Sequence, residues 1–301
     1  MRAPAHRGRF AALLAAAALG ACAAPAGSSG TASTLPEMRV RDAALDARAF
    51  AAEAAFLFPE ESRALARSLM RAELARLEGR RLGIEAPAAE VDEALRMAIG
   101  SIEAALPEGG SFEAWARERY GRNGAEVRGE VRRHLAGNLL YQLVLRADAE
   151  LGRRHRLHLL ITGDEALARR WAGELRQGAD PRALAGESAD RGIDGQGERL
   201  LPAYLPDPLG AATAAARPGD VIGPLQLQGD RAWLVLRLAE TLPPAAGPPP
   251  IAVLLEELGR RPVDPLEARA WFEEMLRRYT AAEALPAIQA PSPAFVPLER
   301  P

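Results

Sequence analysis

The chain has 301 residues, enough for two domains of ordinary size with a core each. All 38 of its basic residues are arginine, and its 40 acidic residues give a formal net charge of -2. This balance argues against a nucleic-acid-binding protein, which needs a basic surface, so we expect no nucleic-acid partner. The single cysteine, Cys22, excludes an intramolecular disulfide.

The N-terminus has the pattern of a bacterial secretion signal. Three arginines precede an apolar run, Phe10 to Ala21, that is too short to span a bilayer. The run ends in Leu19-Gly20-Ala21-Cys22, which resembles the lipobox of bacterial lipoproteins. The resemblance implies a signal peptide at residues 1–21, a lipid anchor on Cys22 and a periplasm-facing protein of the cell envelope. Ala23 stands where aspartate would resemble an inner-membrane retention signal, which favours the outer membrane. The alternative is an ordinary signal peptide with an incidental cysteine.

Residues 22–37 are rich in small residues and proline, and we expect them to form a flexible tether. Residues 38–151 are then predicted to be helical throughout. Apolar residues recur at helical spacing, and glycines follow the stripes where helices end. Ser111 is a predicted N-cap. The apolar stripes comprise Met70, Leu74 and Leu77, then Val91, Leu95 and Ala98, and finally Val127, Val131, Leu135 and Leu139.

Residues 153–242 mix strand and helix patterns. In the strand Leu157 to Ile161, the odd-numbered side chains share one face, and His158 shares the other with Leu160. A helical stripe ends before Gly178, and Asp180-Pro181 is a typical helix start. Two more strands, residues 221–227 and 232–238, follow. This composition predicts an α+β domain with a small antiparallel sheet.

The C-terminal part begins with a proline-rich linker, residues 243–250. Residues 251–285 are predicted to form helices, the second of which starts at Asp264-Pro265-Leu266-Glu267. We expect this second helix to have an apolar face. The tail after it, residues 286–301, is expected to be unstructured. The apolar face of the helix consists of Ala268, Phe272, Met275 and Tyr279.

The order of elements from Arg156 to Leu238 resembles the parvulin-type peptidylprolyl isomerases, with Ser188-Ala189-Asp190 and Gly219-Asp220-Val221-Ile222-Gly223-Pro224 at two of the family's motifs. The segment Ala75 to Leu95 is similar to SurA-like periplasmic chaperones, and PrsA-type foldases share the whole layout. The resemblance implies a helical chaperone domain completed by the C-terminal helices, with the parvulin-like domain inserted. It also implies unfolded or partly folded exported polypeptides as partners, and no cofactor.

The resemblance also assigns roles to single residues. Prolyl isomerisation has to overcome amide resonance, a barrier of roughly 18–20 kcal/mol, and needs an apolar pocket with polar groups that favour the twisted amide. His158 and Asp190 match the catalytic positions. The substrate-binding positions fall on Leu209, Ala214 and Trp233, of which Trp233 replaces a second histidine and cannot accept a hydrogen bond.

Each role has a structural alternative. His158 is equally well explained as a sheet histidine with a satisfied hydrogen bond, Asp190 as a solvated loop acid and Trp233 as a core residue. His155 lies three residues before His158, but no carboxylate or cysteine set accompanies the pair, so we expect no metal site. Two functions therefore stay open: a foldase with prolyl isomerase activity, and a non-catalytic holdase with a degenerate parvulin domain. A purely structural lipoprotein fits neither resemblance.

Overall fold

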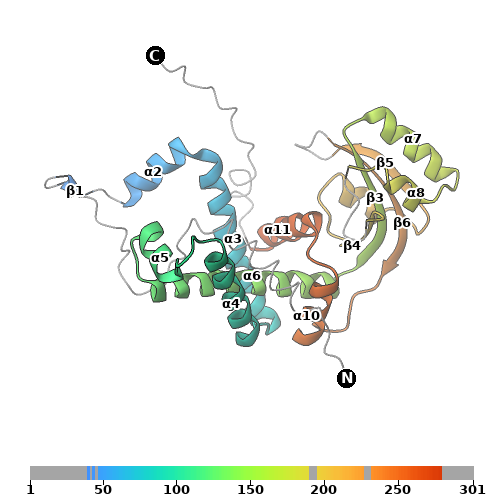
Figure 1. The fold of residues 1–301 in the computed structure, drawn as a ribbon. Helices are drawn as coiled ribbons and strands as arrows, with labels where there is room; N and C mark the ends of the chain where they lie inside the picture. The colour runs from blue at the N-terminus through green and yellow to red at the C-terminus, as the bar shows by residue number, and fades with distance from the viewer. Residues whose placement is uncertain (1–38, 41–42, 45–46, 190–194, 227–231, 280–301) are drawn as a thin grey trace, which may run out of the picture. The chain divides into compact units, whose positions relative to one another are not determined.

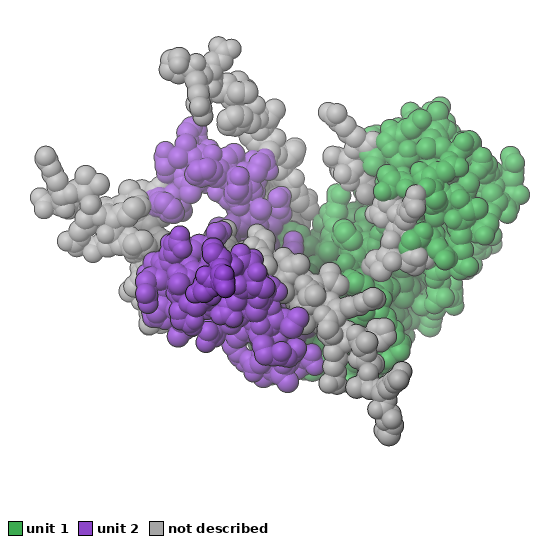
Figure 2. Space-filling model, viewed as in Figure 1, with its two compact units in different colours: residues 1–7, 78–85, 140–286 green, residues 8–77, 86–139, 287–301 purple. Residues whose placement is uncertain are grey.

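The protein is described by a computed structural model that covers residues 39–40, 43–44, 47–189, 195–226 and 232–279 (Figure 1). Its contacts divide the chain into two units (Figure 2). Among the described residues, unit 1 contains 78–85 and 140–279, and unit 2 contains those from 39 to 77 and from 86 to 139. The division falls inside two long helices.

Unit 2 is almost entirely helical. It opens with two short strands, β1 (Arg39–Val40) and β2 (Ala43–Ala44), which pair antiparallel. The prediction of helix from residue 38 onwards is therefore wrong at its start, because a two-residue hairpin has no periodicity that a sequence can show. The helices that follow are α2 (Ala47–Leu57), α3 (Pro59–Leu82), α4 (Ala88–Ala104), α5 (Phe112–Tyr120) and α6 (Gly124–Leu151).

The ends of these helices follow the predicted capping chemistry. α3 ends at Gly83, whose φ of 68° lets the amide of Ile84 donate to the carbonyl of Gly79 at 2.9 Å. Ser111 caps α5 by accepting from the amide of Ala114, and Gly121 ends it in the left-handed conformation. The sequence thus places these boundaries correctly because they depend on local contacts alone.

α6 changes character along its length. In its first half one face is buried, and that face consists of the four residues predicted from their spacing, Val127, Val131, Leu135 and Leu139. From Leu143 to Ala149, by contrast, every residue is buried. A helix that is buried on all sides needs packing partners on all sides. Elements distant in the sequence supply these in unit 1.

Unit 1 contains a four-stranded antiparallel sheet with the strand order β4-β3-β6-β5. Two helices, α7 and α8, pack on one face, and a third, α9, packs on the other. The strands are β3 (Arg154–Thr162), β4 (Glu198–Pro202), β5 (Val221–Gln226) and β6 (Trp233–Leu242). The helices are α7 (Glu165–Arg176), α8 (Pro181–Ala185) and α9 (Leu209–Ala214).

The predicted strands and helices of this region are confirmed, but β4 and α9 were not predicted. β4 is short and contains a buried arginine, Arg199, which gives it no apolar alternation. α9 is six residues long and rich in alanine, too short to show a helical period. Both elements become stable only through packing on the sheet.

The chain ends with α10 (Ile251–Arg260) and α11 (Pro265–Tyr279). The predicted apolar face of α11 is wrong: Ala268 and Phe272 are half-buried and Tyr279 is exposed. The error has a physical cause, since the face that is buried includes a glutamate, and a buried charge looks like a surface residue in a sequence. The buried residues are Glu267, Ala270, Trp271, Met275 and Leu276.

These elements confirm the α+β fold class, with ten helices among the described residues. The inserted-domain arrangement is not confirmed. The C-terminal helices belong to unit 1, together with the sheet and with residues 78–85 and 140–151 of the predicted helical domain. None of the helices that the structure describes is long and apolar enough to cross a membrane.

Candidate functional site

The two faces of the sheet carry different residues. On β3, Leu157 and Leu159 point into an apolar cluster with α9, while Leu160 points into a cluster with α7 and α8. Successive side chains of a strand alternate between faces. His158 therefore lies on the face that α7 and α8 cover, and Leu209 of α9 lies on the opposite face.

The surroundings of His158 are mostly polar. In the strand register it lies directly across from Glu198 on β4 and from Arg237 on β6. Glu198 accepts a long hydrogen bond of 3.5 Å from Arg182 of α8. The Nδ1 atom of His158 is buried and has no hydrogen-bond partner among the described residues. This nitrogen is therefore free to donate or accept a hydrogen bond. The residues across from it in the strand register supply a carboxylate and a guanidinium, and neither a hydroxyl nor a thiol.

The other predicted site residues do not gather around His158. Leu209 is fully buried in the cluster between the sheet and α9, whereas Ala214 is exposed at the end of the same helix. Trp233 is half-buried and shares the face of His158, packed against the cluster of α7. Asp190 and the lipidation residue Cys22 lie outside the described residues. The sheet thus separates the predicted polar residue His158 from the predicted proline-binding residue Leu209.

A second histidine lies on the Leu209 face and was not assigned a role from the sequence. His155 is buried, and its Nδ1 lies 3.1 Å from the hydroxyl of Thr241 on β6. Burial lowers the pKa of His155, and the positive charge of Arg153 lowers it further, so the ring is neutral at pH 7. Its even spacing from Leu157 and Leu159 was the signal that could have placed it on this face.

The Leu209 face meets α11 through a small set of contacts, which we call the sheet–α11 interface. Arg199 of β4 forms a buried ion pair with Asp264, the residue before α11. The side chain of Arg261 donates to the carbonyl of Leu200 at 2.7 Å. The apolar part of the interface consists of Leu266 and Ala270 of α11, which belong to the same cluster as Leu209.

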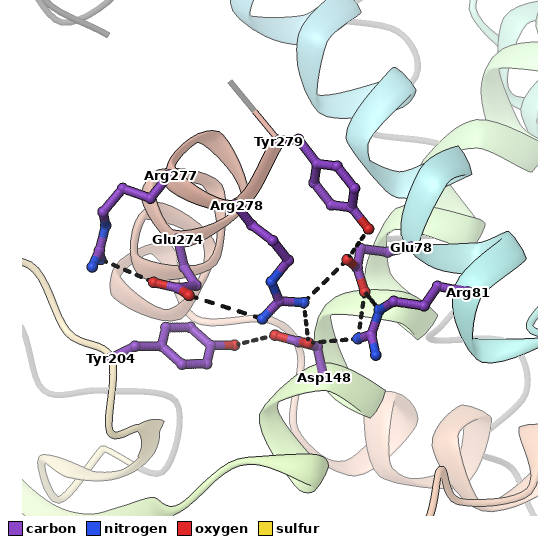
Figure 3. Close-up of polar contacts among 8 residues, drawn as sticks. All are labelled: Glu78, Arg81, Asp148, Tyr204, Glu274, Arg277, Arg278 and Tyr279. Atoms are coloured by element: carbon purple, nitrogen blue, oxygen red, sulfur yellow. Dashed lines mark hydrogen bonds and ion pairs between the residues drawn. The ribbon is translucent and has the colours of Figure 1, made fainter. Parts of the chain in front are cut away.

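Beside this interface lies a network of charged and phenolic side chains (Figure 3). Asp148 of α6 accepts from the hydroxyl of Tyr204 at 3.0 Å, and Arg278 of α11 lies 3.2 Å from it. Glu78 of α3 pairs with Arg278 at 3.1 Å and also accepts hydrogen bonds from Arg81 and Tyr279. Three helices of unit 1 (α3, α6 and α11) and the loop after β4 are therefore joined by these two carboxylates, two arginines and two phenols.

The electrostatics of this network follow from its burial. Burial raises the pKa of Tyr204 well above its ordinary value, and the negative charge of Asp148 raises it further, so the phenol stays protonated and donates. Burial also acts to raise the pKa of Glu78, but the hydrogen bonds from Arg81 and Tyr279 and the charge of Arg278 outweigh it and hold the pKa below its ordinary value. Glu78 is therefore ionised, as a partner of two arginines should be.

Unit 2 presents a different kind of surface. Of the large apolar side chains that are exposed among the described residues, most lie on α2 and the first part of α3. Phe56 is 73% exposed and its neighbours Leu57 and Phe58 are more than half exposed. We call this set the α2–α3 apolar surface. It consists of Phe50, Phe56, Leu57, Phe58 and Leu69.

No group of histidine, cysteine, aspartate and glutamate side chains that could hold a metal ion occurs in the part of the chain that the structure describes. The geometry gives three candidate sites, which are the two faces of the sheet and the α2–α3 apolar surface. The sheet offers a histidine and a covered apolar cluster, and unit 2 offers an uncovered apolar surface.

Comparison with known proteins gives solved structures alone, since no protein-family model and no curated protein matches the chain. The foldase protein PrsA of Streptococcus pneumoniae is 14% identical, with 84% of this chain and 96% of that chain covered and a TM-score of 0.32. PrsA of Bacillus subtilis is 12% identical, with 83% and 95% covered and a TM-score of 0.28. The peptidylprolyl isomerase PrsA of Bacillus anthracis is 13% identical, with 68% and 94% covered and a TM-score of 0.28. At these identities and TM-scores the similarity assigns no activity to this chain.

Proposed function

We propose that this chain is a chaperone of the bacterial envelope that holds unfolded exported polypeptides on the α2–α3 apolar surface. The observation that carries the proposal is the exposure of Phe56, Leu57 and Phe58, three consecutive large apolar residues in unit 2. Soluble proteins rarely leave neighbouring large apolar side chains uncovered, and such patches mark interaction sites.

The chemistry of this surface fits an unfolded partner. Fully burying one large apolar side chain contributes about 1.5–3 kcal/mol, so several such contacts give a useful but reversible affinity. The five side chains that define the surface carry no hydrogen-bonding group, so it selects exposed apolar side chains rather than one sequence. Phe50 and Leu57 lie seven residues apart, on one side of α2, and so can contact the same client segment.

The predicted location in the cell envelope is part of the same proposal. A signal peptide at residues 1–21 and a lipid on Cys22 would place the chain on the periplasmic side of a membrane, where exported clients are still unfolded. The sequence pattern around Cys22 supports this. Labelling with a radioactive fatty acid in the producing bacterium, with Cys22→Ser as control, tests the anchor.

The test of the holding function is suppression of the aggregation of an unfolded client by the mature chain, followed by light scattering. We expect the triple variant Phe56→Ser, Leu57→Ser, Phe58→Ser to lose most of the suppression, because the client contact is removed. Val253, an exposed apolar residue of α10 in unit 1, supplies the matched control as Val253→Ser. Equal suppression of aggregation by the triple variant and the wild type would show that the client does not bind on this surface.

Dimerisation through the α2–α3 apolar surface is the main competing explanation for its exposure in a single chain. Sedimentation of the wild type and the triple variant distinguishes the two. If the wild type is a dimer and the variant a monomer, and neither suppresses aggregation, the surface joins two copies of the chain and the holding function is rejected.

Prolyl isomerisation is the second candidate function. The observation that favours it is the buried Nδ1 of His158, which has no partner among the described residues and lies on the strand whose sequence matches the parvulin motif. The separation of His158 from Leu209 by the sheet weighs against a proline pocket built from both. Holding is therefore the function that the geometry supports best.

A proline-peptide isomerisation assay decides on this second function. Any activity above background should fall in His158→Ala and persist in His134→Ala, which changes a half-buried histidine of α6 in unit 2. A wild-type rate equal to background rejects the isomerase and leaves the holding function untouched.

A further inference from the structure

α11 is attached to its two sides in different ways. On the side of α6 it is held by large residues: the ring of Trp271 lies edge-on to Tyr141 with centroids 5.3 Å apart, and the fully buried Glu267 pairs with Arg146 at 3.0 Å. On the side of the sheet its apolar contacts come from a small residue, Ala270, and from Leu266. α11 therefore packs against α6 with larger side chains than it packs against the sheet.

The sheet–α11 interface is mainly polar. The ion pair of Arg199 with Asp264, the bond from Arg261 to the carbonyl of Leu200, and the bond from Tyr204 to Asp148 all cross from the sheet or the loop after β4 to the helices. Polar interfaces between parts of one chain are typical of parts that move, since each polar group can bond to water once the parts have separated.

Beneath this interface lies the apolar cluster of the sheet. Leu201, Leu205 and Leu209 are buried there. In the closed arrangement α11 covers part of this cluster, so no client reaches it. If the sheet moves away from α11, the cluster is uncovered, and Arg199 loses its carboxylate partner at the rim.

We propose that the sheet–α11 interface is a reversible autoinhibitory contact: α11 covers part of the apolar cluster that contains Leu209, and opening the interface offers this cluster to an unfolded segment that carries a carboxylate beside apolar residues. The carboxylate replaces Asp264 as the partner of Arg199, and the apolar residues replace Leu266 and Ala270. The proposal deepens the proposed function by adding a second, covered binding surface for the same kind of client.

The test uses the labelling rate of a single thiol as a measure of opening. The mature chain carries Cys22→Ser and Leu209→Cys, and a chromogenic disulfide reagent reports how often position 209 is exposed. Leu266→Cys, on the other side of the interface, serves as a second reporter should the change at Leu209 disturb the fold. Circular dichroism shows that each variant is folded.

Two matched pairs of variants separate opening from general loosening. Tyr204→Phe and Tyr279→Phe each remove one hydroxyl bonded to a carboxylate of the same network, but Tyr204 alone contacts Asp148 from the loop after β4. Asp264→Asn and Asp164→Asn each change a helix-capping aspartate to an equally good cap, but Asp264 alone pairs with Arg199.

We expect Tyr204→Phe and Asp264→Asn to raise the labelling rate about tenfold, which corresponds to about 1.4 kcal/mol in the opening equilibrium, and both controls to leave it within about twofold. A peptide of apolar residues with one glutamate should slow the labelling of these variants more than the same peptide with glutamine. Equal rates within either matched pair, or no protection by the glutamate peptide, would overturn the proposal.

The outcomes also separate this proposal from the function on which it rests. If aggregation suppression depends on Phe56, Leu57 and Phe58 but labelling never responds to Tyr204→Phe, the holding function stands and the autoinhibitory contact is rejected. If labelling and peptide protection respond as expected while the triple serine variant suppresses aggregation normally, the covered face stands and the α2–α3 apolar surface is rejected.

Discussion

Units 1 and 2 differ in where some of their charged and large apolar side chains lie. Unit 1 buries charges in pairs, such as Arg146 with Glu267, both of which are 1% exposed or less. In unit 2 the pairs between different helices lie at the surface, as for Arg132 with Asp92. Most of the exposed large apolar residues among the described residues lie in unit 2, as for Phe56, although unit 2 buries Phe112 as fully as unit 1 buries Trp271.

The difference indicates two kinds of task. Buried ion pairs contribute little net stability, but they fix the arrangement of their partners because any other arrangement leaves a charge unpaired in the core. Exposed aromatic residues do not hold neighbouring elements in place, and they remain available for contact with a partner. The contact between α6 and α11 in unit 1 is therefore held in one geometry, and unit 2 presents a surface.

The largest expected effect is the loss of the buried ion pair. Arg146→Ala leaves Glu267 without its partner and should destabilise unit 1 by about 3–5 kcal/mol, measured by hydrogen exchange in residues 265–279. Because burial raises the pKa of Glu267 despite the opposing charge of Arg146, Glu267→Gln should cost less. Asp92→Ala, which breaks an exposed pair of unit 2, should cost at most about 1 kcal/mol. Equal costs for Arg146→Ala and Asp92→Ala would abolish the contrast between the units.

The aromatic residues supply the second test. Trp271→Ala should cost about 3–5 kcal/mol in chemical denaturation, since it removes a fully buried ring from the contact with Tyr141. Phe56→Ala should change stability by no more than about 0.5 kcal/mol, because the ring is exposed. A large loss in Phe56→Ala would show that this side chain is packed in solution, and the α2–α3 apolar surface would no longer be uncovered.

Two glycines give the third comparison. Gly223 of β5 has a φ of 105°, and a Cβ there would lie 2.5 Å from the carbonyl oxygen of Leu234, so Gly223→Ala should destabilise the sheet by at least about 2 kcal/mol. Gly100 of α4 has open space around it, and Gly100→Ala should stabilise unit 2 by about 0.5–1 kcal/mol. Thermal unfolding of both variants measures the effects. A stable Gly223→Ala protein would contradict the close approach of β5 and β6.

The smallest expected effect is a pH dependence from His155. Its pKa is lower in the folded than in the unfolded chain, so the unfolded chain takes up the proton first as the pH falls below about 6.5. The stability that depends on the neutral ring is therefore present above pH 6.5 and declines below it. The raised pKa values of the half-buried Glu150 and the buried Glu267 act in the opposite direction.

The contribution of His155 is isolated by His155→Asn, which keeps a hydrogen-bonding nitrogen near Thr241. The free energy of unfolding of the wild type should fall more steeply than that of the variant between pH 7 and 5.5. Parallel curves would mean that His155 is not held neutral by burial.

Sequence patterns predicted those features that depend on neighbours in the chain. The cap at Ser111, the helix end at Gly83 and the buried stripe from Val127 to Leu139 follow from local chemistry, and the structure confirms them. The alternation along β3 was also predicted, and it places His158 and Leu160 on one face.

What the sequence could not provide is the partner of each face. Nothing in residues 209–214 shows on which side of β3 they pack, so the separation of His158 from Leu209 required the structure. The buried face of α11 was missed for a related reason. Glu267 looks like a solvent-facing residue until Arg146, 121 positions earlier in the chain, is placed beside it.

The central claim, that unfolded clients bind where unit 2 exposes its aromatic residues, is tested most directly by hydrogen exchange of the mature chain with and without an unfolded client. Exchange protected by the client should appear in residues 50–69, with the closed sheet little affected. Protection confined to residues 153–242, with no change in residues 50–69, would contradict the account.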